Sequence, residues 1–228
     1  MAKDKTYSES CRGDNARNNI VKNYIVEPQF RMSLLPNQKF HNCCTANLVE
    51  YDSNSTTELV VFKITKKSNQ NFSQILKMGN DCAKKLINVS NNAGGNIQMP
   101  NMINLLSTIN GTSISSRGTS TISMPISREI LVNRELLKAI FMVVFLAWEG
   151  KELSVKLTNI ILRLSNPTNI DIISDDEICY FINGVLSKDQ QNRTLEQIYN
   201  DVSSKFMKMG TMSFNNLVGY YNSIVCRG

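Results

Sequence analysis

Apolar residues recur every three or four positions through the second half of the chain, which is the spacing of amphipathic helices. Ser127 can cap a helix that reaches Glu149, and Gly150 can supply the left-handed residue that ends it. A second apolar stripe follows over residues 153–164. The pattern therefore predicts an all-α domain over residues 124–228.

Two capping boxes mark helix starts further along this domain. Ser174 is followed three residues later by Glu177, and Thr194 by Gln197, so each pair can satisfy backbone N–H groups at a helix start. An apolar stripe follows each box, and a last stripe begins after Ser213. Five helices with short connections are therefore expected in this half.

The first half has a different pattern. Residues 47–51 and 58–65 are rich in β-branched and aromatic side chains and flank the turn-prone residues 52–56, which predicts a β-hairpin. Residues 71–87 place apolar side chains at helical spacing, which predicts a helix with its lysines, including Lys77, towards solvent.

The remaining segments of the first half show little periodicity. Residues 1–45 carry scattered charges around one short apolar element and are expected to form a flexible basic N-terminal arm. Residues 46–123 form a basic α+β region that ends in an Asn-, Ser-, Thr- and Gly-rich hinge. The predicted fold class is mainly α: a small α+β N-terminal half with a β-hairpin and an arm, and an all-α C-terminal helical domain over residues 124–228.

The net charge of the chain is +6, and all of it lies in the first half. Residues 1–127 contain 14 Lys and Arg against 8 Asp and Glu, whereas residues 128–228 contain 11 of each class. A bias of this kind suits a polyanionic partner such as a nucleic acid. It is equally consistent with an ordinary solvated basic face.

The candidate nucleic-acid contacts are lysines and arginines of the first half. Tyr51, Phe62 and Phe72 are interleaved with them and could stack on bases. The sequence has no signature of an RRM, a KH domain or a zinc knuckle, so contact would be directed at the phosphate backbone. The candidate residues are Lys63, Lys66, Lys67, Lys84, Lys85, Arg117, Arg12, Arg17, Lys22 and Arg31.

Catalytic and metal sites are hard to assemble because the sequence contains a single histidine, His41. Cys43 and Cys44 lie beside it, but the sequence indicates no group to orient a Cys–His pair and lacks the paired spacings of a zinc site. It has no phosphate-binding glycine motif, and the acids at 175–177 are expected to cap a helix. We therefore expect no catalytic site, no metal site and no cofactor.

The longest apolar run, residues 139–148, has about half of the ~20 residues that a membrane-spanning helix needs. The first thirty residues carry charges throughout and lack the apolar core of a secretory signal. An intracellular, cytoplasmic protein with reduced cysteines and no membrane span is therefore expected.

These features favour a non-enzymatic protein that coats single-stranded nucleic acid, RNA in particular, and self-associates into oligomers. Viral nucleocapsid and coat proteins work in this way, and a viral chain would also be found in the virion. The analogy is one of size, charge distribution and terminal arm. Two other classes stay open: a protein–protein adaptor or host-directed regulator that uses the helical domain, and an enzyme of unfamiliar type.

Overall fold

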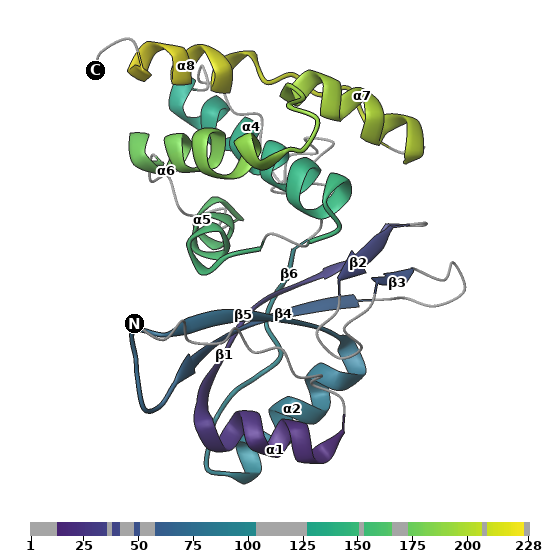
Figure 1. Cartoon of the computed structure of the whole chain (residues 1–228), viewed down its shortest axis with the longest axis vertical. Coiled ribbons are helices and arrows are strands. Elements are labelled where there is room, and N and C mark those ends of the chain that lie inside the picture. Colours follow the sequence, from purple (N-terminus) through teal and green to yellow (C-terminus); the bar gives the residue numbers. More distant parts are fainter. Residues whose placement is uncertain are drawn as a thin grey trace, which may run out of the picture. The chain divides into compact units, whose positions relative to one another are not determined.

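A computed structural model describes residues 13–35, 38–41, 48–50, 58–103, 127–150, 153–165, 173–206 and 209–225. The chain divides into two compact units. Unit 1 comprises Met1–Ile103 and Glu149–Thr158, and unit 2 comprises Asn104–Trp148 and Asn159–Gly228. The described residues are mainly helical, with a small four-stranded mixed sheet in unit 1, so the predicted mainly α class is confirmed at this coarse level (Figure 1).

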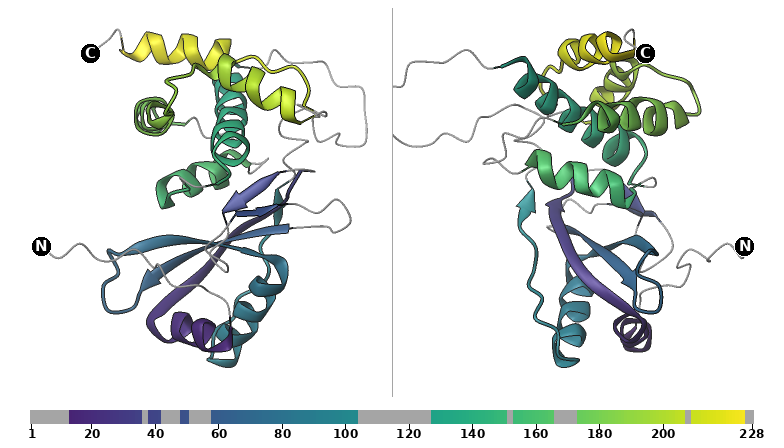
Figure 2. Two further views of the ribbon diagram at one scale, coloured as in Figure 1. Left: turned by 45° about the vertical axis from the view of Figure 1, so that its right-hand side comes forward. Right: turned by 90° about the vertical axis from the view of Figure 1, so that its left-hand side faces the viewer.

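The sheet of unit 1 has the strand order β5-β4-β1-β6. β1 (Tyr24–Ser33) pairs antiparallel with β4 (Glu58–Lys66), which pairs antiparallel with β5 (Ser73–Gly79). β6 (Met102–Ile103) pairs parallel with β1. β1 and β4 therefore occupy the middle of the sheet (Figure 2). β4 is buried on both faces over most of its length, as its Val, Phe and Ile side chains require of a central strand.

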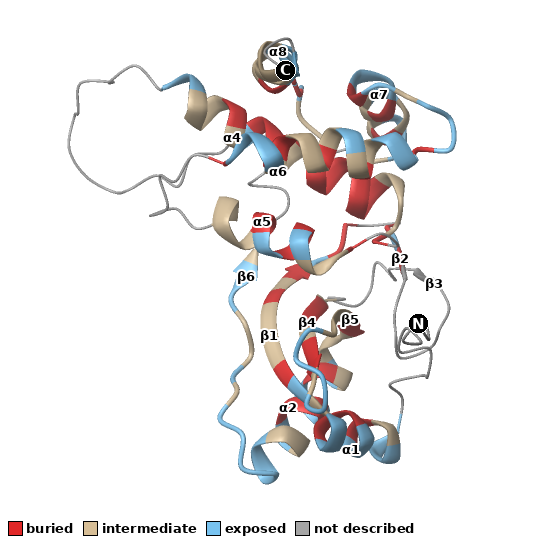
Figure 3. Cartoon of the chain, turned by 60° about the vertical axis from the view of Figure 1, so that its left-hand side comes forward, coloured by how far each residue is buried: buried red, intermediate tan, exposed pale blue. Residues whose placement is uncertain are grey.

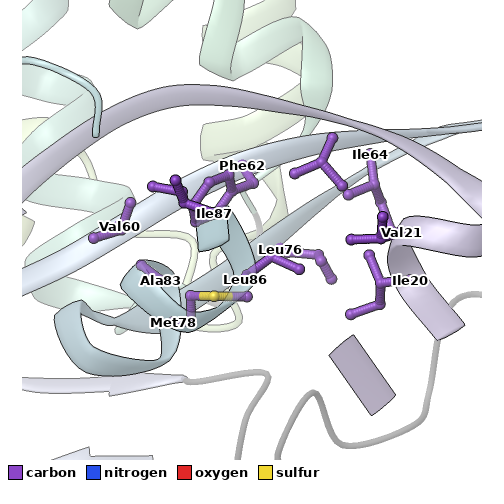
Figure 4. Close-up of a cluster of buried hydrophobic side chains, with 11 residues drawn as sticks. Ile20, Val21, Val60, Phe62, Ile64, Leu76, Met78, Ala83, Leu86 and Ile87 are labelled. Atoms are coloured by element: carbon purple, nitrogen blue, oxygen red, sulfur yellow. The ribbon is translucent and has the colours of Figure 1, made fainter. Parts of the chain in front are cut away.

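Helices α1 (Asp14–Asn23) and α2 (Asn80–Asn92) pack against one face of this sheet (Figure 4). Their apolar stripes meet alternate residues of the strands, because successive side chains of a strand point to opposite faces. The core residues are Ile20, Val21, Ala83, Leu86 and Ile87 from the helices and Val26, Val60, Phe62, Ile64, Leu76 and Met78 from the strands.

The predicted hairpin between residues 47–51 and 58–65 is wrong, although both segments contain strands. β3 (Leu48–Glu50) pairs with β2 (Lys39–His41) in a separate two-stranded sheet, and β4 forms its hairpin with β5. Both edges of β4 are occupied, by β1 and β5, so no edge is left for β3. Residue preference identifies a strand but does not choose its partner.

The helix predicted over residues 71–87 is wrong in its first part, where β5 forms, and α2 begins only after Gly79. Leu76 and Met78 lie two residues apart and enter the core from β5. A short apolar stretch of this kind fits a strand as well as a helix, and pairing with β4 decides between them.

Lys77 was expected at the surface, but it is buried on the face of β5 that points away from α2. Its ammonium group donates a hydrogen bond to the carbonyl oxygen of Gly150 and lies 5.5 Å from the ring centroid of Phe40. The carbonyl and the ring face compensate for the lost hydration of the charge.

Residues 14–33 were expected to belong to the basic arm, but they form α1 and the ten-residue strand β1. Ile20, Phe30 and Met32 are buried. Figure 3 shows buried segments, in red, in both α1 and β1. The register of β1 against β4 shifts between Pro28 and Phe30, and this bulge breaks the regular alternation by which a strand is identified in a sequence.

Unit 2 is built from helices, and none of the described helices is long and apolar enough to cross a membrane. Two of them pass from α-helical into wider π-helical turns. In chain order they are α4 (Arg128–Ile140) with η1 (Phe141–Ala147), α5 (Val155–Ser165), whose first residues are counted with unit 1, α6 (Asp175–Cys179) with η2 (Tyr180–Val185) and η3 (Leu186–Lys188), α7 (Leu195–Lys205) and α8 (Asn215–Val225).

The predicted helix starts agree with the structure. The hydroxyl of Ser127 accepts a hydrogen bond from the backbone N–H of Ile130, and complete capping boxes open α6 at Ser174 and α7 at Thr194. The helix predicted to reach Glu149 ends at Ala147, with Trp148 as its C-cap, so Glu149 (φ +54°) is the first left-handed residue after it and Gly150 (φ +71°) the second. Local side chains set the helix starts, so these can be read from the sequence alone.

A charged network holds the connection between η3 and α7. Asp189 is buried and accepts hydrogen bonds from the guanidinium and backbone N–H of Arg193 and from the indole N–H of Trp148. Arg193 also pairs with Asp201, which accepts from Lys205. The hydrogen bonds from Arg193 hold the pKa of Asp189 well below its ordinary value.

Candidate nucleic-acid interface

The ten candidate residues fall into three groups in the structure. Arg12 and Arg117 lie outside the described residues. Three others are paired with carboxylates, and the remaining five gather on two parts of unit 1. By element, α1 carries Arg17 and Lys22, β1 carries Arg31, β4 carries Lys63 and Lys66, the following turn carries Lys67, and α2 carries Lys84 and Lys85.

The three paired cations have their charge compensated within unit 1, so they are poor phosphate ligands. Arg17 is also buried, with 5% of its surface exposed. The pairs are Arg17–Asp14 at 2.7 Å, Arg31–Glu58 at 3.5 Å and Lys63–Glu27 at 2.9 Å.

The turn between β4 and β5 is attached to the C-terminal end of α1. The backbone N–H of Lys67 donates to the carbonyl oxygen of Asn23, and its ammonium group donates to the carbonyl oxygen of Val21, both at 2.9 Å. These bonds bring Lys66 and Lys67 beside Lys22, the residue between the two acceptors. We call Lys22, Lys66 and Lys67 the basic corner.

Two aromatic rings flank the basic corner. The ammonium nitrogen of Lys66 lies 6.0 Å from the ring centroid of Phe72, and Tyr24 is the register partner of Lys66 in the sheet. Both rings are half-buried and keep part of their surface in solvent. Phe62, a candidate for base stacking, is fully buried in the core and cannot stack, and Tyr51 lies outside the described residues.

Tyr24 was not identified from the sequence as a candidate contact. Its place beside Lys66 follows from the pairing of β1 with β4, which joins segments about forty residues apart. No local spacing indicates such a pairing, so composition alone offered no signal for this residue.

The charges of the basic corner are only partly compensated. Lys22 and Lys67 form no ion pair with a carboxylate among the described residues, and both are exposed. The C-terminal end of α1 carries a partial negative charge of about half an elementary charge, which offsets part of the two positive charges of Lys22 and Lys67. The corner therefore keeps a net positive potential that a phosphate group can meet.

Lys84 and Lys85 are exposed on the solvent side of α2, as predicted. Lys85 lies near enough to Asp14 to help lower the pKa of that carboxyl group, although the hydrogen bond from Arg17 lowers it most. A carboxylate beside the α2 lysines weakens their attraction for an anion. We therefore place the principal contact at the basic corner and a weaker one on α2.

The side chains considered for metal or nucleophile chemistry are also located in the described part of the chain. No group of three or more His, Cys, Asp and Glu side chains gathers there in a way that could hold a metal ion. Cys82 and Cys179 are free thiols, and Glu177 belongs to the capping box of α6. Cys43 and Cys44 lie outside the described residues. Comparison with known protein families, characterised proteins and solved structures found no match to the chain.

Proposed function

We propose that the chain is a non-enzymatic protein that binds single-stranded nucleic acid, RNA in particular, along its phosphate backbone and self-associates into a coat. Viral nucleocapsid and coat proteins act in this way. A chain of this kind would be found in the cytoplasm and in the virion. The basic corner is the contact surface, with Lys84 and Lys85 extending it along α2.

The attachment of Lys67 to α1 carries this proposal. Two hydrogen bonds join segments about 45 residues apart in the sequence, and they bring the turn that carries Lys66 and Lys67 to the end of α1 that carries Lys22. The ordered backbone of the turn and of α1 fixes where these side chains begin, and the bond to Val21 holds the ammonium group of Lys67. Less conformational freedom is then lost when a polyanion binds than if the three lysines lay on a loose segment.

The residue types favour contact with phosphates and with single strands. A lysine offers a compact charge, whereas reading a base edge is typically the work of a forked guanidinium or amide group. The half-buried ring of Phe72 can stack on any base, and so can the exposed part of Tyr24, whose ring otherwise packs against the core. Only the unpaired bases of a single strand are open to them. Binding is therefore expected to depend little on sequence.

The salt dependence of binding tests the proposal. The affinity of the full chain for a short labelled oligouridine, measured by fluorescence anisotropy, should fall steeply as salt rises, with a slope of log K against log salt of about −0.7 per phosphate contact. Changing Lys22, Lys66 and Lys67 together to Gln should make the slope shallower by about two. Salt-insensitive binding by the parent, or a parental slope in the variant, would contradict the proposal.

A second candidate function is a protein–protein adaptor that uses unit 2. Two of the four exposed large hydrophobic side chains of the described residues, Val218 and Val225, lie on α8 of this unit and favour it. Co-purification of the chain with one discrete protein, together with salt-insensitive RNA binding, would support this function over the first.

A further inference from the structure

The solvent side of α1 carries a row of asparagine side chains that ends at Lys22 of the basic corner. The members recur at intervals of three and four residues, which places them on one side of the helix. Asparagine favours a helix less than alanine does, so the stability of α1 does not account for the row. We call it the α1 face, and its exposed members are Asn15, Asn18, Asn19 and Asn23.

The opposite side of α1 fixes the direction of this face. Ile20 and Val21 are buried in the core together with residues of α2, and the two helices lie side by side against the sheet (Figure 1). Arg17 is also buried and pairs with Asp14 at 2.7 Å. These contacts hold the α1 face towards solvent.

Positive charge lies at both ends of α1. The basic corner is at its C-terminal end. At its N-terminal end, the hydrogen bond from Arg17 lowers the pKa of Asp14, and the charge of Lys85 on α2 lowers it further, which places Lys85 nearby. Arg17, Lys84 and Lys85 there exceed the two nearest carboxylates, Asp14 and Asp81, by one charge. The corner is therefore the stronger of two positive ends.

We propose that one single strand of nucleic acid runs along the α1 face, with phosphate groups at the basic corner and at the α2 lysines. This inference rests on the proposed function and deepens it, because it gives the bound strand a path and a minimum length. The amides of the α1 face carry no charge. Phosphate groups can therefore cross from one positive end to the other without meeting a carboxylate between them.

The chemistry of the amides suits this path. An asparagine side chain has an acceptor oxygen and an amino group with two donors, so it can meet a phosphate oxygen, a ribose hydroxyl or a base edge. The amide of Asn23 donates to the side-chain oxygen of Asn19 at 2.7 Å and to its carbonyl oxygen at 3.0 Å. These two amides are thus ordered along the helix before a strand binds.

The length of α1 sets the length of the strand. Asp14 and Lys22 are eight residues apart, which is about 12 Å along a helix axis. Stacked nucleotides advance about 3.4 Å each, so about four steps cover this distance. An octanucleotide therefore reaches both positive ends, whereas a dinucleotide reaches only one and should occupy the stronger, the basic corner.

Competition by 5′-phosphorylated oligouridines of two and eight nucleotides tests the path. Each displaces a labelled octauridine from the full chain at low salt, and fluorescence anisotropy gives its inhibition constant. Lys66→Gln with Lys67→Gln should weaken both lengths. Lys84→Gln with Lys85→Gln should weaken the octanucleotide about fivefold, because a phosphate contact is lost, and should leave the dinucleotide unchanged.

A carboxylate placed on the α1 face tests the same path independently. Asn15 lies about 10 Å along the helix from Lys22, a distance at which salt screens most of the interaction between exposed charges. Asn15→Asp should therefore weaken the octanucleotide about threefold or more and leave the dinucleotide unchanged. The matched control is Asn159→Asp, at an exposed position of α5, which should leave both lengths unchanged. Circular dichroism checks that the variants fold.

The outcomes separate the path from the proposed function. An octanucleotide that binds the α2 double variant like the parent, or that binds Asn15→Asp like the Asn159→Asp control, would overturn the path. Equal losses for the two lengths in the α2 variant would overturn it as well. Salt-sensitive binding that depends on the corner alone would leave the proposed function in place. A corner variant that binds both lengths like the parent would remove the proposed function and the path together.

Discussion

The charged network of unit 2 and the basic corner of unit 1 hold their positive charges in different ways. In unit 2, Arg193 is locked between Asp189 and Asp201, and Lys205 also pairs with Asp201. In unit 1, Lys67 of the basic corner bonds to carbonyl oxygens at the end of α1. The same residue types therefore stabilise a connection in one unit and retain net charge in the other. The partners of a cation, more than its presence, decide whether it is available to a polyanion.

The largest expected effect compares the cores of the two units. Phe181 in η2 and Phe62 in β4 are both fully buried, so replacing either by Ala should reduce the free energy of unfolding by about 3–5 kcal/mol. Urea denaturation followed by circular dichroism measures this loss. A loss below about 1 kcal/mol in either variant would mean that its ring is not packed as the structure has it.

The next effect concerns the network of unit 2. Asp189→Asn leaves Arg193 largely buried without its main partner and should cost about 3 kcal/mol. Trp148, the only tryptophan of the chain, donates to Asp189 and should report the change by its fluorescence during denaturation. Lys188→Gln, at an exposed position one residue earlier, is the control and should cost little. An equal loss in the two variants would argue against the network.

The same pair determines how acid affects unit 2. The folded-state pKa of Asp189 is depressed, so its ion pair contributes stability above the unfolded value of 3.8 and loses it as pH falls through the folded value. The parent should therefore lose stability below about pH 4, and Asp189→Asn should lose less over the same range. The free energy of unfolding of both proteins is measured by urea denaturation at several acidic pH values. An equal loss in the two proteins would contradict the contribution of the Asp189–Arg193 ion pair.

A smaller effect separates two glycines. Gly150 has a positive φ, and a Cβ atom there would overlap the ring of Phe40, so Gly150→Ala should cost about 1–3 kcal/mol. Gly219 lies within α8, where the nearest atom to an added Cβ is a guanidinium nitrogen of Arg128 at 3.8 Å. Gly219→Ala should therefore stabilise the chain by about 0.5–1 kcal/mol. Thermal melts measure both variants. The melting temperature should fall for Gly150→Ala and rise for Gly219→Ala.

The helical half could be predicted well because its boundaries are set by neighbours in the sequence. Ser127, Ser174 and Thr194 cap helices that start within three residues of them. Unit 1 depends instead on pairing between distant segments. The bulge in β1 interrupts the alternation of apolar and polar residues by which a strand is identified. The apolar residues of β5 fit both a helical and a strand spacing. No short stretch of sequence therefore indicates which strands pair.

The candidate site could be predicted only as a set of charges. Lys22, Lys66 and Lys67 were identified by residue type, and their proximity comes from the contact between a helix end and a distant turn. Arg17, Arg31 and Lys63 were identified on the same basis, yet each meets a carboxylate. The number of charges in the sequence does not distinguish these two groups of residues. The fold distinguishes them, because it decides which cations lie beside a carboxylate.

The basic corner is tested most directly by three charge-matched double variants whose salt slopes are measured on the same oligouridine. They are Lys66→Gln with Lys67→Gln in the corner, Lys84→Gln with Lys85→Gln on α2, and Arg134→Gln with Lys188→Gln at exposed positions of unit 2. We predict that the corner pair makes the slope shallower by about 1.4, the α2 pair by less, and the unit 2 pair not at all. Equal slopes for the corner pair and the unit 2 pair would contradict the assignment of the nucleic-acid interface to the basic corner.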